Sequence, residues 1–456
     1  MALAKNEIIC IEITGLSSDG SGVGRADGQA VFVPATAPGD VARVRIVRPM
    51  KTHAFGILEE LITPSPKRAP NDCEAFPRCG GCCFRHIAYP EELSAKQQIV
   101  TDAFQRIGKL DLPILPILPS PRELRYRNKA IYPLGMVDGH VTPGFFAGRS
   151  HRLVPCTDCK LQPTLLNEIA LLFCSLADRF GISVYEETSH RGLLRHLYLR
   201  CGEQSGQVMV CIVINGQELP HAGQICRAIT QQFPAVTTIL INHNTQRTNV
   251  VLGPRSTVLH GTGRISDTLC GLEFSITAPS FYQVNHDGAE RLYAVARDFA
   301  DLPKDSVLLD LYCGIGTIGL SMADQCRELI GVEIVPSAVE MAQENAKRAG
   351  ITNARFIHAD AAEAAASLVK TGLRPNVVIV DPPRKGCDQP TLDAIMEMSP
   401  EKIVMVSCDP ATAARDAAYL TKNGYCAIKV QPVDMFPRTK HVESVILMIH
   451  CAKTEK

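Results

Sequence analysis

Hydrophobic residues follow one rhythm through residues 276–456. The apolar runs VLLDL, ELIGVEI, ARFIH, NVVIV and KIVMV are short, and helical stretches separate them. Continuous apolar runs of this length are typical of strands buried on both faces, and their alternation with helices predicts parallel βαβ units. We therefore predict a doubly wound, Rossmann-like α/β sheet for residues 276–456.

The rest of the chain has a different pattern. Residues 7–62 alternate short β-type runs with turns rich in Gly and Asp, which predicts an OB-like β-barrel over residues 1–64. A proline-rich linker, a cysteine-rich segment over 73–86 and a helical periodicity over 91–110 follow. From about 120 to 275 the pattern is β-rich and mixed. We assign residues 65–275 to a central domain.

Length and composition narrow the class of protein. A chain of 456 residues exceeds one hydrophobic core, and 46% hydrophobic with 21% charged residues is typical of globular proteins. Lys+Arg and Asp+Glu are both 47, so a nucleic-acid partner must be bound by local basic patches. We find no signal peptide or membrane span and expect a cytoplasmic monomer. There the 18 cysteines should stay reduced, as core residues, metal ligands or nucleophiles before disulfides.

Polar residues stand at the carboxyl ends of the predicted parallel strands, where open α/β sheets bind ligands. Gly314 lies in a glycine-rich turn into a helix, which lets a ligand approach backbone N–H groups. Glu333 follows about 20 residues later, as expected for a carboxylate that binds ribose hydroxyls. Asp360 is placed to receive an adenine amino group, and Asp381 begins the stiff tip DPP. Each carboxylate alone could equally cap a helix, but the series predicts a nucleotide cofactor.

Cysteines occur in two settings that suggest chemistry. Cys408 follows the last apolar run directly, within SCDP, although a cysteine in apolar surroundings is usually a small core residue. Cys73, Cys79 and Cys82 have the spacing C-x5-C-x2-C. Three clustered thiols predict a metal ion or an iron–sulfur cluster, and a zinc knuckle fits the count as well.

The motifs DLYCGIGTIGL, DPPRKG, SCDP and HVESV, in this order, resemble the RNA 5-methyluridine methyltransferase family, which uses S-adenosyl-L-methionine. The resemblance covers nearly the whole chain and includes an N-terminal TRAM domain. It implies that Gln283 and Tyr312 contact the cofactor together with Glu333 and Asp381. It also implies a [4Fe-4S] cluster with a remote fourth ligand, for which Cys159 is preferred over Cys156 because CKLQP matches the family pattern.

The family chemistry gives Cys408 a purpose. A thiolate that adds to carbon 6 of uracil makes carbon 5 nucleophilic enough to accept a methyl group. The carbon-5 proton must then leave, and the resemblance assigns the general base to Glu443. Arg384 follows DPP where amino-group methyltransferases usually carry an aromatic residue, so carbon methylation is favoured. Arg384 and Lys385 could be surface charges, but beside the proposed catalytic edge we expect them to meet phosphate.

The sequence also suggests RNA contacts. Arg43, Arg45 and Arg48 alternate along one apolar run and would share a strand face that tracks phosphates, although such stripes are often only solvated edges. The basic segment RYRNK, residues 125–129, suits a splayed single strand. We expect methylation of a specific uridine in RNA, with 23S ribosomal RNA favoured over transfer RNA. A cytosine-C5 methyltransferase and a catalytically silent RNA-binding factor are the alternatives.

Overall fold

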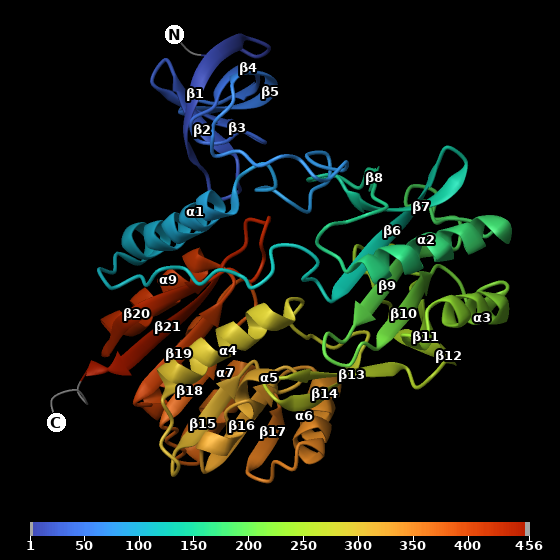
Figure 1. Ribbon diagram of the computed structural model, residues 1–456. Coiled ribbons are helices and arrows are strands. Elements are labelled where there is room, and N and C mark those ends of the chain that lie inside the picture. The colour runs from blue at the N-terminus through green and yellow to red at the C-terminus, as the bar shows by residue number, and fades with distance from the viewer. Residues whose placement is uncertain (1–2, 452–456) are drawn as a thin grey trace.

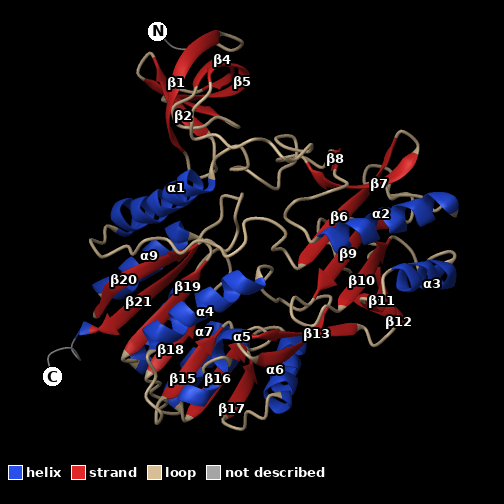
Figure 2. Ribbon diagram, viewed as in Figure 1, coloured by secondary structure: helices blue, strands red, loops and turns tan. Residues whose placement is uncertain are grey.

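The computed structural model describes residues 3–451, which form an N-terminal barrel, a central sheet and a C-terminal sheet (Figure 1). Helices flank the central and C-terminal sheets, and α1 (Tyr89–Asp102) lies beside the barrel (Figure 2). The predicted combination of a β-barrel, a mixed central region and an α/β C-terminal sheet is confirmed at this level.

The N-terminal strands close into a barrel in the order β1-β2-β3-β5-β4. Along one strand Ala42, Val44 and Ile46 are buried, and the residues between them face outwards. This two-residue period is what a half-buried strand requires. The strands are β1 (Ile8–Leu16), β2 (Gly22–Ala26), β3 (Gln29–Val33), β4 (Val41–Pro49) and β5 (His53–Thr63).

The arginines of β4 do not form the expected free stripe. Arg43 pairs with Glu60 at 2.9 Å and Arg45 with Glu59 at 2.5 Å across the β4–β5 ladder. These exposed pairs contribute little to stability, but they neutralise two of the three charges. Within residues 3–451 only Arg48 of the three has no ion pair. The prediction that all three track phosphates is therefore not supported.

Helix α1 (Tyr89–Asp102) connects the barrel side of the molecule to the C-terminal sheet and continues as the π-helical turn η1 (Ala103–Gly108). Pro90 lies in its first turn, where the missing N–H costs nothing, and Lys109 ends it in a left-handed conformation. The predicted helix over 91–110 is confirmed. Its buried residues are Glu92, Lys96 and Val100, spaced four apart on one face.

The central sheet has the order β12-β11-β10-β9-β6-β7-β8, and helices α2 and α3 pack against its core. A hairpin, β13–β14, leads towards the C-terminal sheet. The elements are β6 (Lys129–Val137), β7 (His140–Phe146), β8 (Leu153–Pro155), α2 (Thr164–Arg179), β9 (Leu194–Cys201), β10 (Val208–Ile214), α3 (Ala222–Gln232), β11 (Val236–His243), β12 (Arg255–His260), β13 (Arg264–Leu269) and β14 (Leu272–Thr277).

The C-terminal sheet has the order β17-β16-β15-β18-β19-β21-β20. Its first five strands are parallel, as predicted, and β21 runs antiparallel between β19 and β20. The strand order reverses between β15 and β18, so the ligand crevice is expected at their carboxyl ends. The strands are β15 (Val307–Leu311), β16 (Glu328–Glu333), β17 (Ala354–His358), β18 (Val377–Val380), β19 (Lys402–Ser407), β20 (Tyr425–Val433) and β21 (Glu443–His450).

Helices cover this sheet on both faces, since two separate hydrophobic clusters line it. The helices are α4 (His286–Ala300), α5 (Thr317–Leu320), α6 (Pro336–Arg348), α7 (Ala361–Lys370), α8 (Gln389–Met398) and α9 (Pro410–Lys422), with a short 3-10 turn, η2 (Ala323–Gln325).

One prediction about the cysteines is wrong. Cys426 and Cys451 form a disulfide that joins the start of β20 to the residue after β21. Strand pairing brings the two residues together, which the sequence separation of 25 conceals. All other cysteines are free thiols. Within residues 3–451, no helix combines the length and the apolar composition needed to cross a bilayer.

Candidate functional site

The glycine turn after β15 is bound directly to the end of β16. Gly314 has a positive φ of 56°, and its N–H donates to Glu333 Oε2 at 3.0 Å. Glu333 Oε1 accepts from the Val335 N–H at 2.9 Å. A Cβ at Gly314 would meet nothing within 4 Å, so this side of the turn is open space. Gly314 and Glu333 lie together, as the spacing predicted.

Asp310 binds the backbone of the helix that follows the same turn. It is buried in β15, and its Oδ2 accepts from the Gly319 N–H at 2.9 Å. A side chain at Gly319 would place its Cβ 2.7 Å from that oxygen, so glycine is required there. Asp310 Oδ1 is buried without a partner among the described residues, and burial raises the pKa of the carboxyl to about 8. The sequence did not single out this residue.

The other predicted cofactor residues, Asp360, Tyr312 and Gln283, differ in burial and in hydrogen-bond partners. Asp360 caps helix α7 by accepting from the Ala362 N–H at 3.0 Å, so the simpler alternative holds for one of its oxygens. Tyr312 has a positive φ of 67° and lies half-buried near Thr391 and Cys387. Gln283 is buried before α4, where its carbonyl accepts from the Asn128 side chain at 2.9 Å. Their roles towards a cofactor stay predictions.

Cys408 and Glu443 lie opposite each other at one edge of the C-terminal sheet. Ser407 of β19 pairs with Ser444 of β21 in antiparallel register, so the next residues, Cys408 and Glu443, are also neighbours. Asp381 follows β18, the strand beside β19. The sheet therefore brings the predicted nucleophile, the predicted base and a cofactor carboxylate to the same edge.

Burial controls the ionisation of these three groups. It raises the pKa of Glu443 to about 8, with a further contribution from Asp381, and that of Asp381 to about 7. The Cys408 thiol is half-buried, and burial together with the Glu443 carboxyl raises its pKa to about 11. Perturbed acids in such a cluster are typical of functional sites.

Arg384 is the cation of this cluster. Its guanidinium hydrogen-bonds Cys408 and lowers the pKa of both the thiol and Glu443. It also lies 3.4 Å from His441 Nε2. Burial and nearby cations, Arg384 first among them, lower the pKa of His441 to about 4, so this ring is neutral. The predicted contact of Arg384 with phosphate stays a prediction, and in the structure its guanidinium lies beside the thiol.

The thiol opens into a cleft of about 820 Å³. The cleft is lined by residues at one edge of the C-terminal sheet, by helix α1 with η1, and by the barrel turn at Ser17–Asp19. Cys408, Arg384, Lys440 and His441 are among the residues that line the cleft.

The cysteines predicted to bind a metal lie together in space, although they come from two segments that are distant in the sequence. Cys73, Cys79 and Cys82 of the cysteine loop and Cys156 and Cys159, which follow β8, line a small cavity of about 80 Å³. Arg85 and Arg127 line it as well and lower the pKa of the Cys82 thiol, although burial outweighs them. Within residues 3–451, no group of three or more His, Cys, Asp or Glu side chains is arranged to hold a single metal ion.

Cys159 and Cys156 differ in their surroundings. A hydrogen bond from Cys156 and the backbone N–H groups of Leu161 and Gln162 lower the pKa of Cys159. The same sulfur–sulfur contact raises the pKa of Cys156. Since metals bind thiolates, this difference favours Cys159, and its role as fourth ligand stays a prediction.

The basic segment 125–129 is not an exposed RNA surface. Tyr126 and Asn128 are fully buried, and the Tyr126 hydroxyl donates to the Pro437 carbonyl at 2.9 Å. Arg125 donates to the carbonyls of Cys159 and Gln162. The prediction that this segment binds single-stranded RNA is wrong for these residues, because internal contacts occupy them.

Two family models match the chain. Residues 264–451 match the model described as tRNA (Uracil-5-)-methyltransferase, and residues 4–58 match the TRAM domain. A Clostridium tetani protein described as an RNA methyltransferase is 40% identical over 452 residues, 99% of this chain and 98% of its own length. A relative from Halalkalibacterium halodurans with the same description is 40% identical and covers 97% of each chain.

A solved structure extends the similarity to the whole fold. The crystal structure of Pyrococcus abyssi tRNA (uracil-54, C5)-methyltransferase in complex with S-adenosyl-L-homocysteine superposes with a TM-score of 0.77. The two chains are 26% identical, and the match covers 97% of this chain and all of that one.

Proposed function

The chain belongs to the RNA methyltransferase family as an S-adenosylmethionine-dependent uracil-C5 enzyme, and we propose that it works through a covalent Cys408 adduct that Glu443 resolves. The single observation that supports this mechanism is the pairing of Cys408 with Glu443 at the cofactor edge. The proposed nucleophile and base thus come from the ends of neighbouring strands beside Asp381, and Cys408 lines the cleft described above.

Cys408 begins the reaction. Its thiol loses a proton to solvent through the cleft, and the thiolate adds to carbon 6 of the uracil, which makes carbon 5 a nucleophile. S-Adenosylmethionine, when bound, supplies the methyl group that carbon 5 accepts. Because the thiol pKa is about 11 in the free chain, Arg384 has the task of stabilising the thiolate.

Glu443 completes the reaction by accepting the carbon-5 proton, after which the bond between Cys408 and carbon 6 breaks. Its pKa of about 8 suits this task, since a base works best near the operating pH. Arg384, which lowers the pKa of Glu443, keeps part of this carboxyl ionised at neutral pH. One guanidinium therefore serves both groups.

We also propose a [4Fe-4S] cluster on Cys73, Cys79, Cys82 and Cys159. One zinc ion would draw four sulfurs to about 2.3 Å from a single point, whereas a four-iron cluster holds them further apart. The thiols line one cavity, and Arg85 and Arg127 balance the negative charge of the thiolates. The cluster would hold the cysteine loop to the segment after β8.

RNA would enter by the cleft, with the target base flipped out to reach Cys408. The barrel offers a second contact: Phe32, His53 and Phe55 form a trio of rings with centroids 5.2–5.7 Å apart on β3 and β5. Arg48 pairs opposite Phe55 in the β4–β5 ladder. Aromatic rings beside a cation suit unpaired nucleotides.

A tritium-release assay tests the reaction on RNA that carries uridine labelled at carbon 5. Transfer RNA and 23S ribosomal RNA are separate arms: the solved Pyrococcus abyssi relative is named for tRNA, whereas the sequence favoured ribosomal RNA. Release with either RNA supports uracil methylation. Release only from labelled cytidine supports the cytosine alternative, and no release from either base, with cofactor bound, indicates a silent RNA-binding factor.

A further inference from the structure

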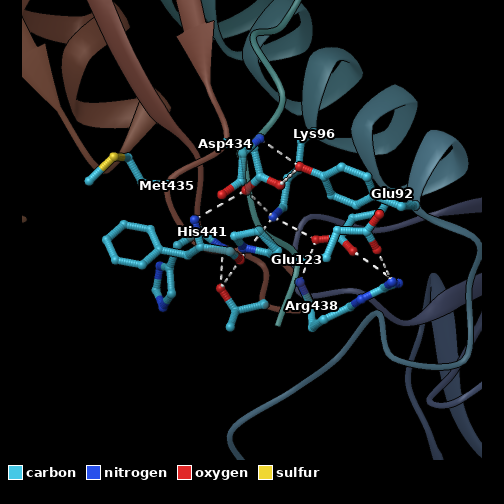
Figure 3. A network of polar contacts seen from close by, with 12 residues as sticks. Glu92, Lys96, Glu123, Asp434, Met435, Arg438 and His441 are labelled. Carbon is cyan, nitrogen blue, oxygen red and sulfur yellow. Dashed lines mark hydrogen bonds and ion pairs between the residues drawn. The ribbon is translucent and has the colours of Figure 1, made fainter. Parts of the chain in front are cut away.

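A buried ion network joins helix α1 to the segment Asp434–Arg438, which lies between β20 and β21 (Figure 3). The Lys96 side chain is fully buried, and its Nζ donates to Glu92 Oε1 at 2.8 Å and to Asp434 Oδ1 at 2.7 Å. A third bond from Nζ reaches the Phe436 carbonyl at 3.0 Å. One ammonium group thus fixes two points of this segment.

The carboxylates of the network add further bonds to the same segment. Asp434 Oδ2 accepts from the Tyr89 hydroxyl of α1 at 2.8 Å, and Glu92 Oε1 accepts from the Arg438 N–H at 2.7 Å. Buried ion pairs are costly to desolvate, and apolar residues of similar volume are often at least as stabilising. Stability alone is therefore a weak reason for these charges, whereas fixing one conformation of a connection is a role such networks can have.

Residues 83–87, which include the end of the cysteine-rich segment, also hydrogen-bond the segment Asp434–Arg438. The N–H groups of Cys83 and Phe84 donate to the Arg438 carbonyl at 2.9 and 3.2 Å, and Arg438 Nη1 donates to the Ile87 carbonyl at 2.9 Å. Arg438 also pairs with Glu123 and has a positive φ of 71°. A residue in this conformation persists only where its surroundings hold it.

The segment leads directly to the catalytic edge. His441, which faces Arg384, packs its ring edge-on against Phe436 at a centroid distance of 6.0 Å. Glu443 begins β21 immediately afterwards. Cys408, by contrast, follows β19 directly and takes no part in the network. A shift of the segment would therefore move the base relative to the nucleophile.

We propose that Lys96, with Glu92 and Asp434, is a positioning residue for proton removal in the reaction proposed above, on which this inference rests. In that step the C5–H bond breaks and its proton passes to the Glu443 carboxylate. The electron pair forms the C5–C6 double bond while the bond from carbon 6 to the Cys408 sulfur breaks and regenerates the thiolate. Methyl transfer precedes this step and does not need Glu443 in place.

The test separates the two steps in the full-length protein. Lys96→Met leaves two buried carboxylates uncompensated and is therefore accompanied by the triple variant Glu92→Gln, Lys96→Met, Asp434→Asn, which removes every charge but keeps the shape. Lys402→Met is the matched control, because Lys402 also bonds two carbonyls and a carboxylate, at the end of β19 opposite Cys408. Melting temperatures and cofactor binding establish which variants fold.

Single-turnover reactions then measure methyl incorporation into RNA and, on denaturing gels, the lifetime of the protein–RNA adduct. We expect the folded network variants to lengthen the adduct lifetime on the order of 10-fold or more, with methyl transfer changed less than about threefold. Hydrogen exchange in residues 434–442 should become faster in parallel. Lys402→Met should leave the adduct lifetime unchanged.

An adduct lifetime equal to wild type in a folded variant would overturn the proposal. So would an equal loss in both steps, since that is the result of a merely structural network. If wild-type protein forms no adduct while it methylates RNA, the covalent mechanism itself is wrong, which is a separate outcome.

Discussion

Two thiols of this protein, Cys408 and Cys159, have opposite electrostatic surroundings. Cys408 lies among carboxyl groups, and burial with Glu443 raises its pKa to about 11, against the single guanidinium of Arg384. Cys159 receives hydrogen bonds from Cys156 and from two backbone N–H groups and has Arg127 nearby, all of which lower its pKa. A permanent thiolate suits a metal ligand, whereas a thiol that ionises only when a substrate arrives suits a reversible nucleophile.

Removing each thiol in turn tests this contrast most strongly. Cys408→Ala should reduce methylation on the order of 10⁴-fold or more, because no other group can activate carbon 5. S-Adenosylmethionine binding, measured by calorimetry, should stay within about twofold of wild type. Residual turnover near the wild-type rate would contradict the covalent mechanism.

The corresponding change at the other thiol, Cys159→Ser, is tested on the proposed cluster in anaerobically purified protein. We expect loss of the brown iron–sulfur absorption and a lower melting temperature, because the cysteine loop loses one attachment. Cys156→Ser is the matched control and should keep the absorption. A cluster that survives Cys159→Ser but not Cys156→Ser would exchange the roles of the two residues.

The next largest effect is expected at Arg384. Arg384→Gln removes the cation beside the thiol, so the pKa of Cys408 rises, and kcat/KM should fall roughly 10- to 100-fold near pH 7. Alkylation of Cys408 by iodoacetamide, followed by mass spectrometry without RNA, should slow by about tenfold or more. Lys385→Gln, a change at the exposed neighbour, should leave the alkylation rate unchanged.

This measurement distinguishes two roles of Arg384. If Arg384 only met phosphate, as the sequence suggested, alkylation without RNA would keep its rate, and the loss would appear in KM and in the salt dependence of RNA binding. The structural prediction requires the alkylation rate to change in the free protein.

The variant Glu443→Gln tests the acidic surroundings of Cys408 through the pH dependence of the free energy of unfolding. The folded pKa of Glu443, about 8, lies above its ordinary value of 4.5, so its ionisation opposes folding. This penalty is absent below about pH 4.5, grows as the pH rises and is complete above about pH 8. Glu443→Gln should therefore stabilise the protein by about 4 kcal/mol at pH 8 and by nothing at pH 4. Urea unfolding at both pH values measures it, and equal effects at both would contradict the cause.

Sequence patterns predicted those parts of the site that depend on local periodicity. The glycine turn at Gly314, the carboxylate Glu333 and the thiol at Cys408 all follow from strands that end at one sheet edge. The pairing of β19 with β21, which places Glu443 beside Cys408, required family resemblance, because antiparallel register over a long connection leaves no local signal.

The predictions that failed depend on contacts between distant segments. Tyr126 and Arg125 have the composition of an RNA-binding strand, yet their partners are Pro437 and Cys159. Lys96 has an ordinary helix position, and only its partner Asp434, 338 residues away, explains why it is buried. Charge in a sequence does not reveal whether its partner is solvent, nucleic acid or another part of the chain.

The smallest expected effect concerns the charge of the cofactor. Burial raises the pKa of Asp381 to about 7 and that of Asp310 to about 8, so both carboxyls ionise as the pH rises from 6 to 8. S-Adenosylmethionine carries a sulfonium charge that S-adenosylhomocysteine lacks, and only an ionised carboxylate attracts it. The affinity ratio of the two ligands should therefore rise about threefold to tenfold over this range. Asp381→Asn should flatten the ratio, whereas Glu363→Gln, a change at an exposed residue of α7, should not. If this affinity ratio does not depend on pH in the wild-type protein, the two carboxyls do not interact with the sulfonium charge. The acidic surroundings of Cys408 would then need another explanation.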